Sequence, residues 1–143
     1  MNAINSVLFT RAGWGITVLR VFVGIIFMAH GSQKLFGLFG GGGLAGTAQY
    51  MESLGLTPPT LMAMLSGGAE FFGGLALVIG LLVRPAALAL VGLLLVAIFS
   101  VHIGNGLFMA NNGYEFALAL LGGAVAVLVE GAGRASLDRM IAK

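Results

Sequence analysis

Ionisable side chains are rare in this sequence, and several of them lie within or at the ends of long apolar segments. The segment FMAHGSQKLF, residues 27–36, ends an apolar run with polar and basic side chains. Ionisable groups within apolar segments of membrane length are costly and typically functional. Histidine and lysine can donate protons, and carboxylates can relay them, so this pattern favours proton-coupled chemistry. The candidate catalytic residues are His30, Glu70, His102 and Glu115, and the candidate ligand-binding residues are Arg20, Gln33 and Lys34.

The composition indicates the class of protein that carries these residues. Of the 143 residues, 59% are hydrophobic and 8% are charged, whereas about a quarter of a soluble domain is charged. The net charge of +2 is too small and dispersed for a nucleic-acid partner. The absence of cysteine excludes disulfides, thiolate catalysis and cysteine metal sites. We therefore predict an integral membrane protein whose principal partner is the lipid bilayer, and we identify no signal peptide.

Four apolar segments predict an all-α, membrane-embedded four-helix bundle that forms a single domain over residues 1–143. A membrane-spanning helix needs about 20 apolar residues, and open sheets cannot satisfy their backbone in lipid. The expected spans are residues 14–36, 61–83, 85–103 and 114–130, with an outer loop at 37–60 that contains a short interfacial helix at 47–54.

Basic residues predict the orientation of the bundle. The basic residues outside the expected spans all fall on one side of the membrane, and they are Arg11, Arg84, Arg134, Arg139 and Lys143. The loops on the other side, between the first and second spans and between the third and fourth, carry no Lys or Arg. The positive-inside rule therefore places both termini in the cytoplasm.

Two pairs of segments indicate an internal repeat. FMAHGSQKLF and FSVHIGNGLF share the pattern F-x-x-H-x-x-x-x-L-F, and GAEF and GYEF share G-x-E-F. These matches favour two helical hairpins related as a parallel repeat, as in some transporters. Chance recurrence within a restricted set of residue types is the alternative.

Helical geometry predicts that the ionisable groups converge in the outer half of the bundle. Helical rise places Glu70 near the membrane centre, His30 about 7 Å above it, and His102 and Glu115 about 10 Å above it. Arg20 lies below the centre, and we expect its long side chain to reach up toward Glu70. Small residues on the same helix faces predict that both glutamates point into the bundle. The expected result is one sealed cluster in which two cations balance two carboxylates.

The segments LRVFVGIIFMAHGSQKLFG, GGAEFFGGLALVIGLLVRPAAL, NNGYEFALALL and GAGRASLD, in this order, resemble the DoxX family of small bacterial membrane proteins. The resemblance covers nearly the whole chain and implies a four-helix protein of the cytoplasmic (inner) membrane. It also implies a link to quinone-dependent redox systems, since the family takes its name from a subunit associated with a terminal quinol oxidase and thiosulfate:quinone oxidoreductase. The polar positions that the resemblance transfers are Arg20, His30, Gln33, Lys34, Glu70, Arg84, His102 and Glu115.

Several functions remain open for these residues. They could bind a quinone or another small redox molecule, with electrons supplied by a redox partner protein. They could instead form a structural network that only fixes helix packing in an assembly subunit. A metal site is less favoured because Lys34 would repel a cation and no H-x-x-x-H or E-x-x-H pair occurs. Small-solute transport is also less favoured, because four short helices enclose little volume unless the chain forms a homo-oligomer. The cofactor therefore stays unassigned, with quinone as the candidate.

Overall fold

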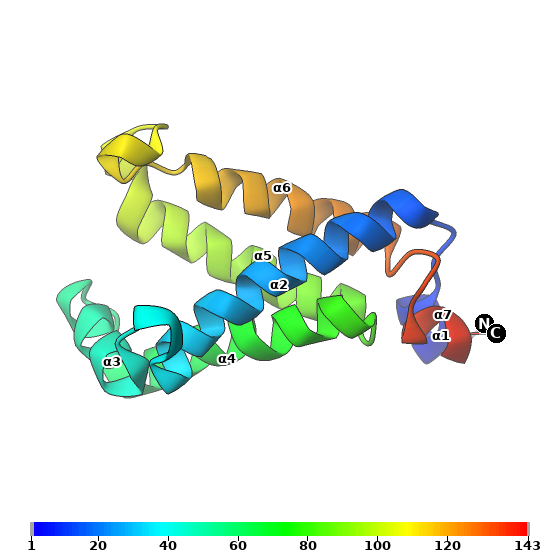
Figure 1. Ribbon diagram of the computed structural model, residues 1–143, viewed down its shortest axis with the longest axis horizontal. Helices are drawn as coiled ribbons and strands as arrows, with labels where there is room; N and C mark the ends of the chain where they lie inside the picture. Colours follow the sequence, from blue (N-terminus) through cyan, green and yellow to red (C-terminus); the bar gives the residue numbers. More distant parts are fainter. Residues whose placement is uncertain (1, 143) are drawn as a thin grey trace.

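Four long helices make up most of the computed structural model, which describes residues 2–142 (Figure 1). They are α2 (Trp14–Phe36), α4 (Pro59–Ile79), α5 (Val83–Ala97) and α6 (Glu115–Glu130). The described part of the chain contains no strand, so the predicted all-α class is confirmed.

Shorter helical segments flank and connect these four helices. They are α1 (Ala3–Leu8), η1 (Leu38–Gly40), α3 (Gly43–Ser53), η3 (Ile103–Asn105), η4 (Met109–Asn111), α7 (Leu137–Ile141) and a π-helical turn, η2 (Ile98–His102), that continues α5. The helix α3 overlaps the short helix expected at 47–54 but begins earlier, at Gly43.

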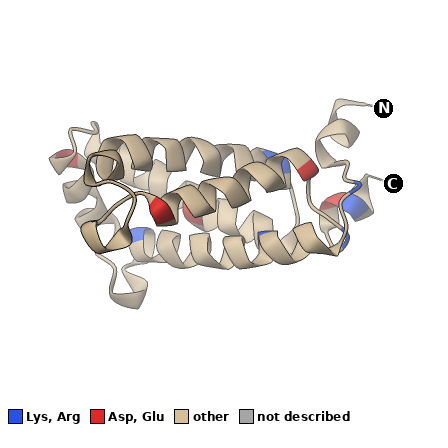
Figure 2. Cartoon of the chain, turned by 90° about the horizontal axis from the view of Figure 1, so that it is seen from above, with Lys and Arg blue, Asp and Glu red and all other residues tan. Residues whose placement is uncertain are grey.

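The four long helices form two antiparallel pairs. Helix α2 packs along α4, α5 packs along α6, and α4 contacts α5 while α2 contacts α6. Both described ends of the chain, with α1 and α7, lie at the same end of the bundle as the α4–α5 turn, which we call the terminal end (Figure 1). The opposite end, which carries α3 and residues 104–113, is the loop end. Most Lys and Arg residues lie toward the terminal end (Figure 2); Lys143, used above for orientation, is outside the described residues.

The pair α2–α4 is held at backbone contact by glycine. A Cβ atom added at Gly31 would lie 2.4 Å from the backbone nitrogen of Phe71, and one at Gly24 would lie 2.7 Å from the carbonyl oxygen of Gly74. Small residues allow such close approach of membrane helices. The two helices therefore form the tightest seam of the bundle. This seam carries residue 34 in the last turn of α2 and residue 70 near the middle of α4.

The turn between α4 and α5 comes earlier than the sequence predicted. Helix α4 ends at Ile79 because Gly80 adopts φ 76°, the left-handed conformation that commonly terminates helices. The expected span 61–83 is thus shorter at this end, and Val83 already belongs to α5. At the loop end, α5 loosens into the π turn instead of continuing as α-helix to residue 103.

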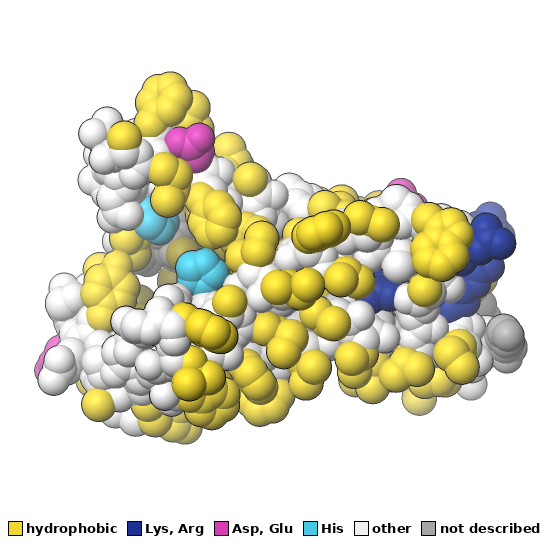
Figure 3. Space-filling model, viewed as in Figure 1, with side chains coloured by type: hydrophobic (Ala, Val, Ile, Leu, Met, Phe, Trp, Pro, Cys, Tyr) yellow, Lys and Arg dark blue, Asp and Glu magenta, His cyan; other side chains and the backbone are white. Residues whose placement is uncertain are grey.

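Apolar side chains fill the bundle and also cover its surface. All four long helices contribute to one buried core, with Phe27, Leu77, Leu90 and Val127 among its members. Hydrophobic side chains also cover much of the exposed face (Figure 3), as expected of a surface in contact with lipid. Three described helices are long and apolar enough to cross a membrane, Trp14–Phe36, Pro59–Ile79 and Val83–Asn105. Helix α6, with 16 residues, is shorter, so the fourth span stays a prediction.

Candidate functional site

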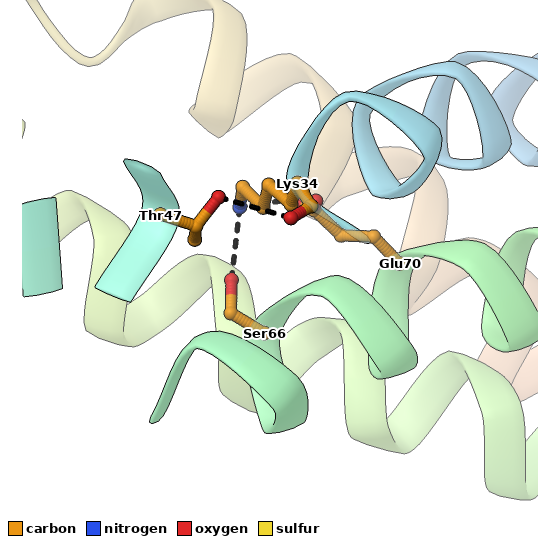
Figure 4. Close-up of polar contacts among 4 residues, drawn as sticks. All are labelled: Lys34, Thr47, Ser66 and Glu70. Carbon is orange, nitrogen blue, oxygen red and sulfur yellow. Dashed lines mark hydrogen bonds and ion pairs between the residues drawn. The ribbon is translucent and has the colours of Figure 1, made fainter. Parts of the chain in front are cut away.

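An ion pair between a half-buried lysine and a buried glutamate joins the last turn of α2 to the middle of α4. The Nζ atom of Lys34 donates to Oε1 of Glu70 at 2.8 Å and to Oγ of Ser66 at 2.9 Å (Figure 4). The hydroxyl of Thr47, on α3, donates to the backbone carbonyl of Lys34 at 3.1 Å. Lys34 belongs to the last turn of α2, where a cation is favoured by the helix dipole. Three helices thus fix the position of the lysine and its carboxylate partner.

The second carboxylate oxygen of Glu70 has no hydrogen-bond partner among the described residues. Glu70 is only 7% exposed, and within residues 2–142 its Oε2 atom is a buried oxygen without a hydrogen bond. Leaving a buried polar atom unsatisfied costs about 1–3 kcal/mol, and more for a charged group. Glu70 is therefore equipped to accept a hydrogen bond from a bound molecule or to take up a proton.

Glu70 lines a cavity of about 570 Å³ between α3, α4 and the loop end of α5, which we call the α4–α5 cavity. This volume lies within the range of small-molecule sites. Most of its lining is apolar, and its polar members are Lys34, Tyr50, Ser66, Glu70, Ser100 and His102. A few polar groups in an apolar cavity are typical of a site that orients an amphipathic ligand.

His102 is oriented by the loop that follows it. Its Nδ1 atom lies 2.9 Å from the carbonyl oxygen of Asn112. Because a carbonyl only accepts hydrogen bonds, Nδ1 of the neutral ring carries the proton, and Nε2 is left with its lone pair. The residues that line the cavity therefore include two proton-accepting groups, the carboxylate of Glu70 and the ring of His102.

The structure does not bring the other candidates to this cavity, and the expectation for Arg20 is wrong. Arg20 is 1% exposed and points to the terminal end, where Nε donates to Ala132 at 2.5 Å and Nη1 to Val78 at 2.9 Å. It also donates to the carbonyls of Leu77 and Ala135. The last carbonyls of a helix lack intrahelical partners, so the end of α4 attracts the guanidinium away from Glu70.

Glu115 and His30 also lie elsewhere. Glu115 was expected to point into the bundle, but it is exposed, and its Oε2 accepts the backbone N–H of Met109 at 2.6 Å. As the first residue of α6, it stabilises the preceding loop. The exposed His30 contacts Phe116, with ring centroids 6.0 Å apart, between α2 and α6.

Gln33 also stabilises the loop end and does not line the cavity. Its side-chain amide donates to the backbone carbonyl of Phe39 at 3.1 Å. Of the seven candidates, Lys34, Glu70 and His102 share one cavity. This cavity is not sealed, because lining residues such as Leu65 and Val96 are exposed. The loop end is also hollowed, with both histidine side chains at the hollow (Figure 3). Within residues 2–142, no three His, Asp or Glu side chains are arranged to hold a metal ion.

Sequence reasoning missed two features of the site. Ser66, which binds Lys34, lies four residues before Glu70 on the same face of α4, a spacing that could have identified it. The cover provided by α3, through Tyr50 and Met51, depends on how the loop folds back and leaves no signal in the sequence.

The terminal end is held by a separate polar network. Asp138, in α7, is 1% exposed and accepts the N–H groups of Leu82 and Val83 at 2.7 and 2.9 Å, which caps the start of α5. Arg84 donates to the carbonyls of Leu128 and Val129 at the end of α6. These side chains satisfy helix ends, so we assign them to stability.

Comparison with known proteins identifies the family. The DoxX family model matches residues 15–103. The chain is 34% identical to "Inner membrane protein YqjF" of Escherichia coli, over 90% of this chain and 93% of that protein. It is also 34% identical to "Putative oxidoreductase CatD" of Bacillus subtilis, over 74% of this chain and 72% of that protein. No solved structure matches the chain significantly. Together with its apolar helices, these similarities show that the chain is a membrane protein and that it belongs to the DoxX family.

Proposed function

We propose that this protein binds a quinol or quinone in the α4–α5 cavity as the membrane subunit of a redox system. The observation that carries the proposal is the buried carboxylate of Glu70, which is paired through one oxygen and unpartnered through the other, in a cavity of ligand size. A hydroxyl group of a quinol would satisfy this oxygen. The name of the Bacillus relative, which includes the word oxidoreductase, is consistent with a redox role.

The chemistry follows from the two acceptors in the cavity. Oxidation of a quinol to a quinone releases two protons and two electrons. Glu70 would accept one proton, and the ring of His102 would accept the other and pass it to the hollow at the loop end. Lys34 would hold Glu70 in place through its hydrogen bond to Oε1. The electrons would pass to a redox partner protein, and quinone reduction would run the same steps in reverse.

We further propose that α6 is the fourth membrane span and that residues 1–143 form one domain in the cytoplasmic membrane. The termini would then face the cytoplasm, because they share an end with most of the basic residues. The name of the Escherichia relative supports the inner membrane as the location. This placement puts the loop end, and the hollow beside His102, on the outer side.

Substitution of Glu70 by glutamine tests the proposed binding. The variant keeps the size of the side chain but removes the charged acceptor, so we expect it to bind decylubiquinol at least about tenfold more weakly, which is about 1.4 kcal/mol. Binding would be measured on detergent-purified protein by quenching of intrinsic fluorescence, and extracted quinone would be quantified by chromatography. The control is Glu130→Gln, at the opposite end of the bundle, which should bind like the wild type. The proposal would be overturned if the wild-type protein bound neither the quinol nor the quinone.

A structural role is the second candidate, because the Lys34–Glu70 pair joins α2 to α4. Under this alternative, Glu70→Gln would lower the thermal stability in detergent and leave quinol binding and co-purified quinone unchanged. Under the proposed function, binding falls even in protein that remains monodisperse.

A further inference from the structure

We propose that the α4–α5 cavity opens sideways into the bilayer, so that its ligand is a lipid-soluble molecule with a hydroxyl-bearing headgroup and an apolar chain. This inference rests on the proposed function and adds the route and the chemical class of the ligand. The headgroup would reach Glu70 through the gap between α4 and α5. We call this gap the α4–α5 seam, and it is distinct from the close-packed seam between α2 and α4. The apolar chain would stay in the α4–α5 seam.

The rim of this seam is apolar and exposed. Leu65 on α4 is 58% exposed and Val96 on α5 is 51% exposed, yet both line the cavity. Ala89 and Gly92, on the same face of α5, are also exposed lining residues. A cavity wall that is open to the surrounding medium, within helices long enough to cross a membrane, faces acyl chains.

The depth of the seam matches the depth of Glu70. Glu70 lies nine residues before the end of α4 at Ile79, and Gly92 lies nine residues after the start of α5 at Val83. Because the helices are antiparallel, both residues lie about 13 Å from their connecting turn, close to the middle of a hydrocarbon core of about 30 Å. A ligand that uses the seam therefore meets the carboxylate without leaving the core.

The cavity separates polar from apolar surface in the way an amphipathic ligand requires. Ser100 and His102 lie in the π turn at the loop end of α5, whereas the exposed lining residues nearer the middle of the two helices are apolar or glycine: Leu65, Ala89, Gly92 and Val96. In this arrangement, protons leave at the loop end, beside Ser100 and His102. An apolar chain has favourable contacts only along the seam.

Gly92 offers a way to close the seam without disturbing the fold. A Cβ atom at Gly92 would meet no atom within 4 Å, so a larger side chain fits on the helix and projects into the opening. Gly68 on α4 has equally open surroundings but does not line the cavity. The substitutions Gly92→Leu and Gly68→Leu are therefore a matched pair.

The experiment compares decylubiquinol with the same headgroup lacking the chain, 2,3-dimethoxy-5-methylhydroquinone, on protein in lipid nanodiscs. We expect Gly92→Leu to weaken binding of the chain-bearing ligand about tenfold, equivalent to losing contact with about two CH₂ groups, and to leave the chainless ligand unaffected. Gly68→Leu should bind both like the wild type.

Four results would overturn or separate the proposals. Wild-type affinity of Gly92→Leu for the chain-bearing ligand would refute access through the seam. Equal loss of both ligands would also refute it, because the leucine would then fill the headgroup site. If either of these results occurs and Glu70→Gln still weakens the binding of both ligands, the proposed function stands and only the route is wrong. If Glu70→Gln binds both ligands with wild-type affinity, the proposed function fails.

Discussion

Two buried charged side chains, Arg20 and Glu70, differ in how completely their hydrogen bonds are satisfied. The guanidinium of Arg20 has backbone carbonyls as partners for all three of its nitrogens, from α4 and from the segment after α6. Glu70 uses one oxygen and leaves the other without a partner in the described chain. A satisfied buried charge stabilises a fold, whereas a half-satisfied one is available to a ligand. We therefore assign Arg20 to stability and Glu70 to binding.

Replacing Arg20 tests this assignment at the residue scale. Arg20→Leu leaves several buried carbonyls unpaired, so we expect a loss of about 3 kcal/mol in the free energy of unfolding. Arg20→Lys should lie between this variant and the wild type, because an ammonium cannot reproduce the planar set of donors. The measurement is thermal unfolding in detergent.

The control for Arg20 is Arg11→Leu, which alters an exposed arginine near the same end of the bundle and should change stability little. Wild-type stability of Arg20→Leu would contradict the assignment.

Among the helices, the seam between α2 and α4 positions the Lys34–Glu70 pair. Gly24, Gly31 and Gly74 allow the two backbones to touch, and the pair lies just beyond the last of these contacts toward the loop end. A side chain in the seam would separate the helices over the length that aligns lysine and glutamate. The geometry of the site thus depends on residues that make no contact with it.

Gly31→Ala is the corresponding test at the scale of the element. The added methyl group overlaps the backbone of Phe71, and we expect a loss of about 1–3 kcal/mol in stability together with weaker quinol binding. Gly15→Ala is the control, since it changes the same helix where a Cβ meets no atom within 4 Å. This control should be neutral or slightly stabilising because alanine favours helix. Equal melting temperatures for Gly31→Ala and Gly15→Ala would refute the role of the α2–α4 seam in stabilising the fold.

The positions of the helices follow from hydrophobicity, whereas their ends and partners depend on tertiary contacts. The apolar run from Trp14 to Phe36 predicted α2 with the bounds observed. Helical geometry predicted that the ionisable groups converge in the outer half of the bundle, and the structure brings Lys34, Glu70 and His102 of this set to one cavity. The destination of Arg20 was predicted wrongly, because the carbonyls that attract it belong to the end of α4 and to a non-helical segment after α6 whose fold no periodicity reveals. Hydropathy also gives no sign of the π turn that ends with His102.

For the molecule as a whole, the placement of both described ends at one end of the bundle makes orientation testable. The chain has no cysteine, so single cysteines introduced at chosen sites can report on accessibility without background. We expect Asn111→Cys, at the loop end, to react with a membrane-impermeant maleimide in intact cells. Arg139→Cys, at the terminal end, should react only after permeabilisation. The reverse pattern would invert the proposed topology and place the hollow in the cytoplasm.

The ion pair between α2 and α4 also constrains how the chain is inserted during synthesis. Lys34 and Glu70 are separated by 36 positions, so the lysine-bearing helix leaves the ribosome well before its counter-charge. A lone lysine at the helix centre costs about 2.5–3.5 kcal/mol on insertion scales, and less near the helix end. Lys34 lies in the last turn of α2, so release of α2 alone into lipid would incur the smaller cost, whereas joint release with α4 would avoid it. The translocon is therefore expected to hold α2 until α4 arrives and to pass both into the bilayer as one hairpin.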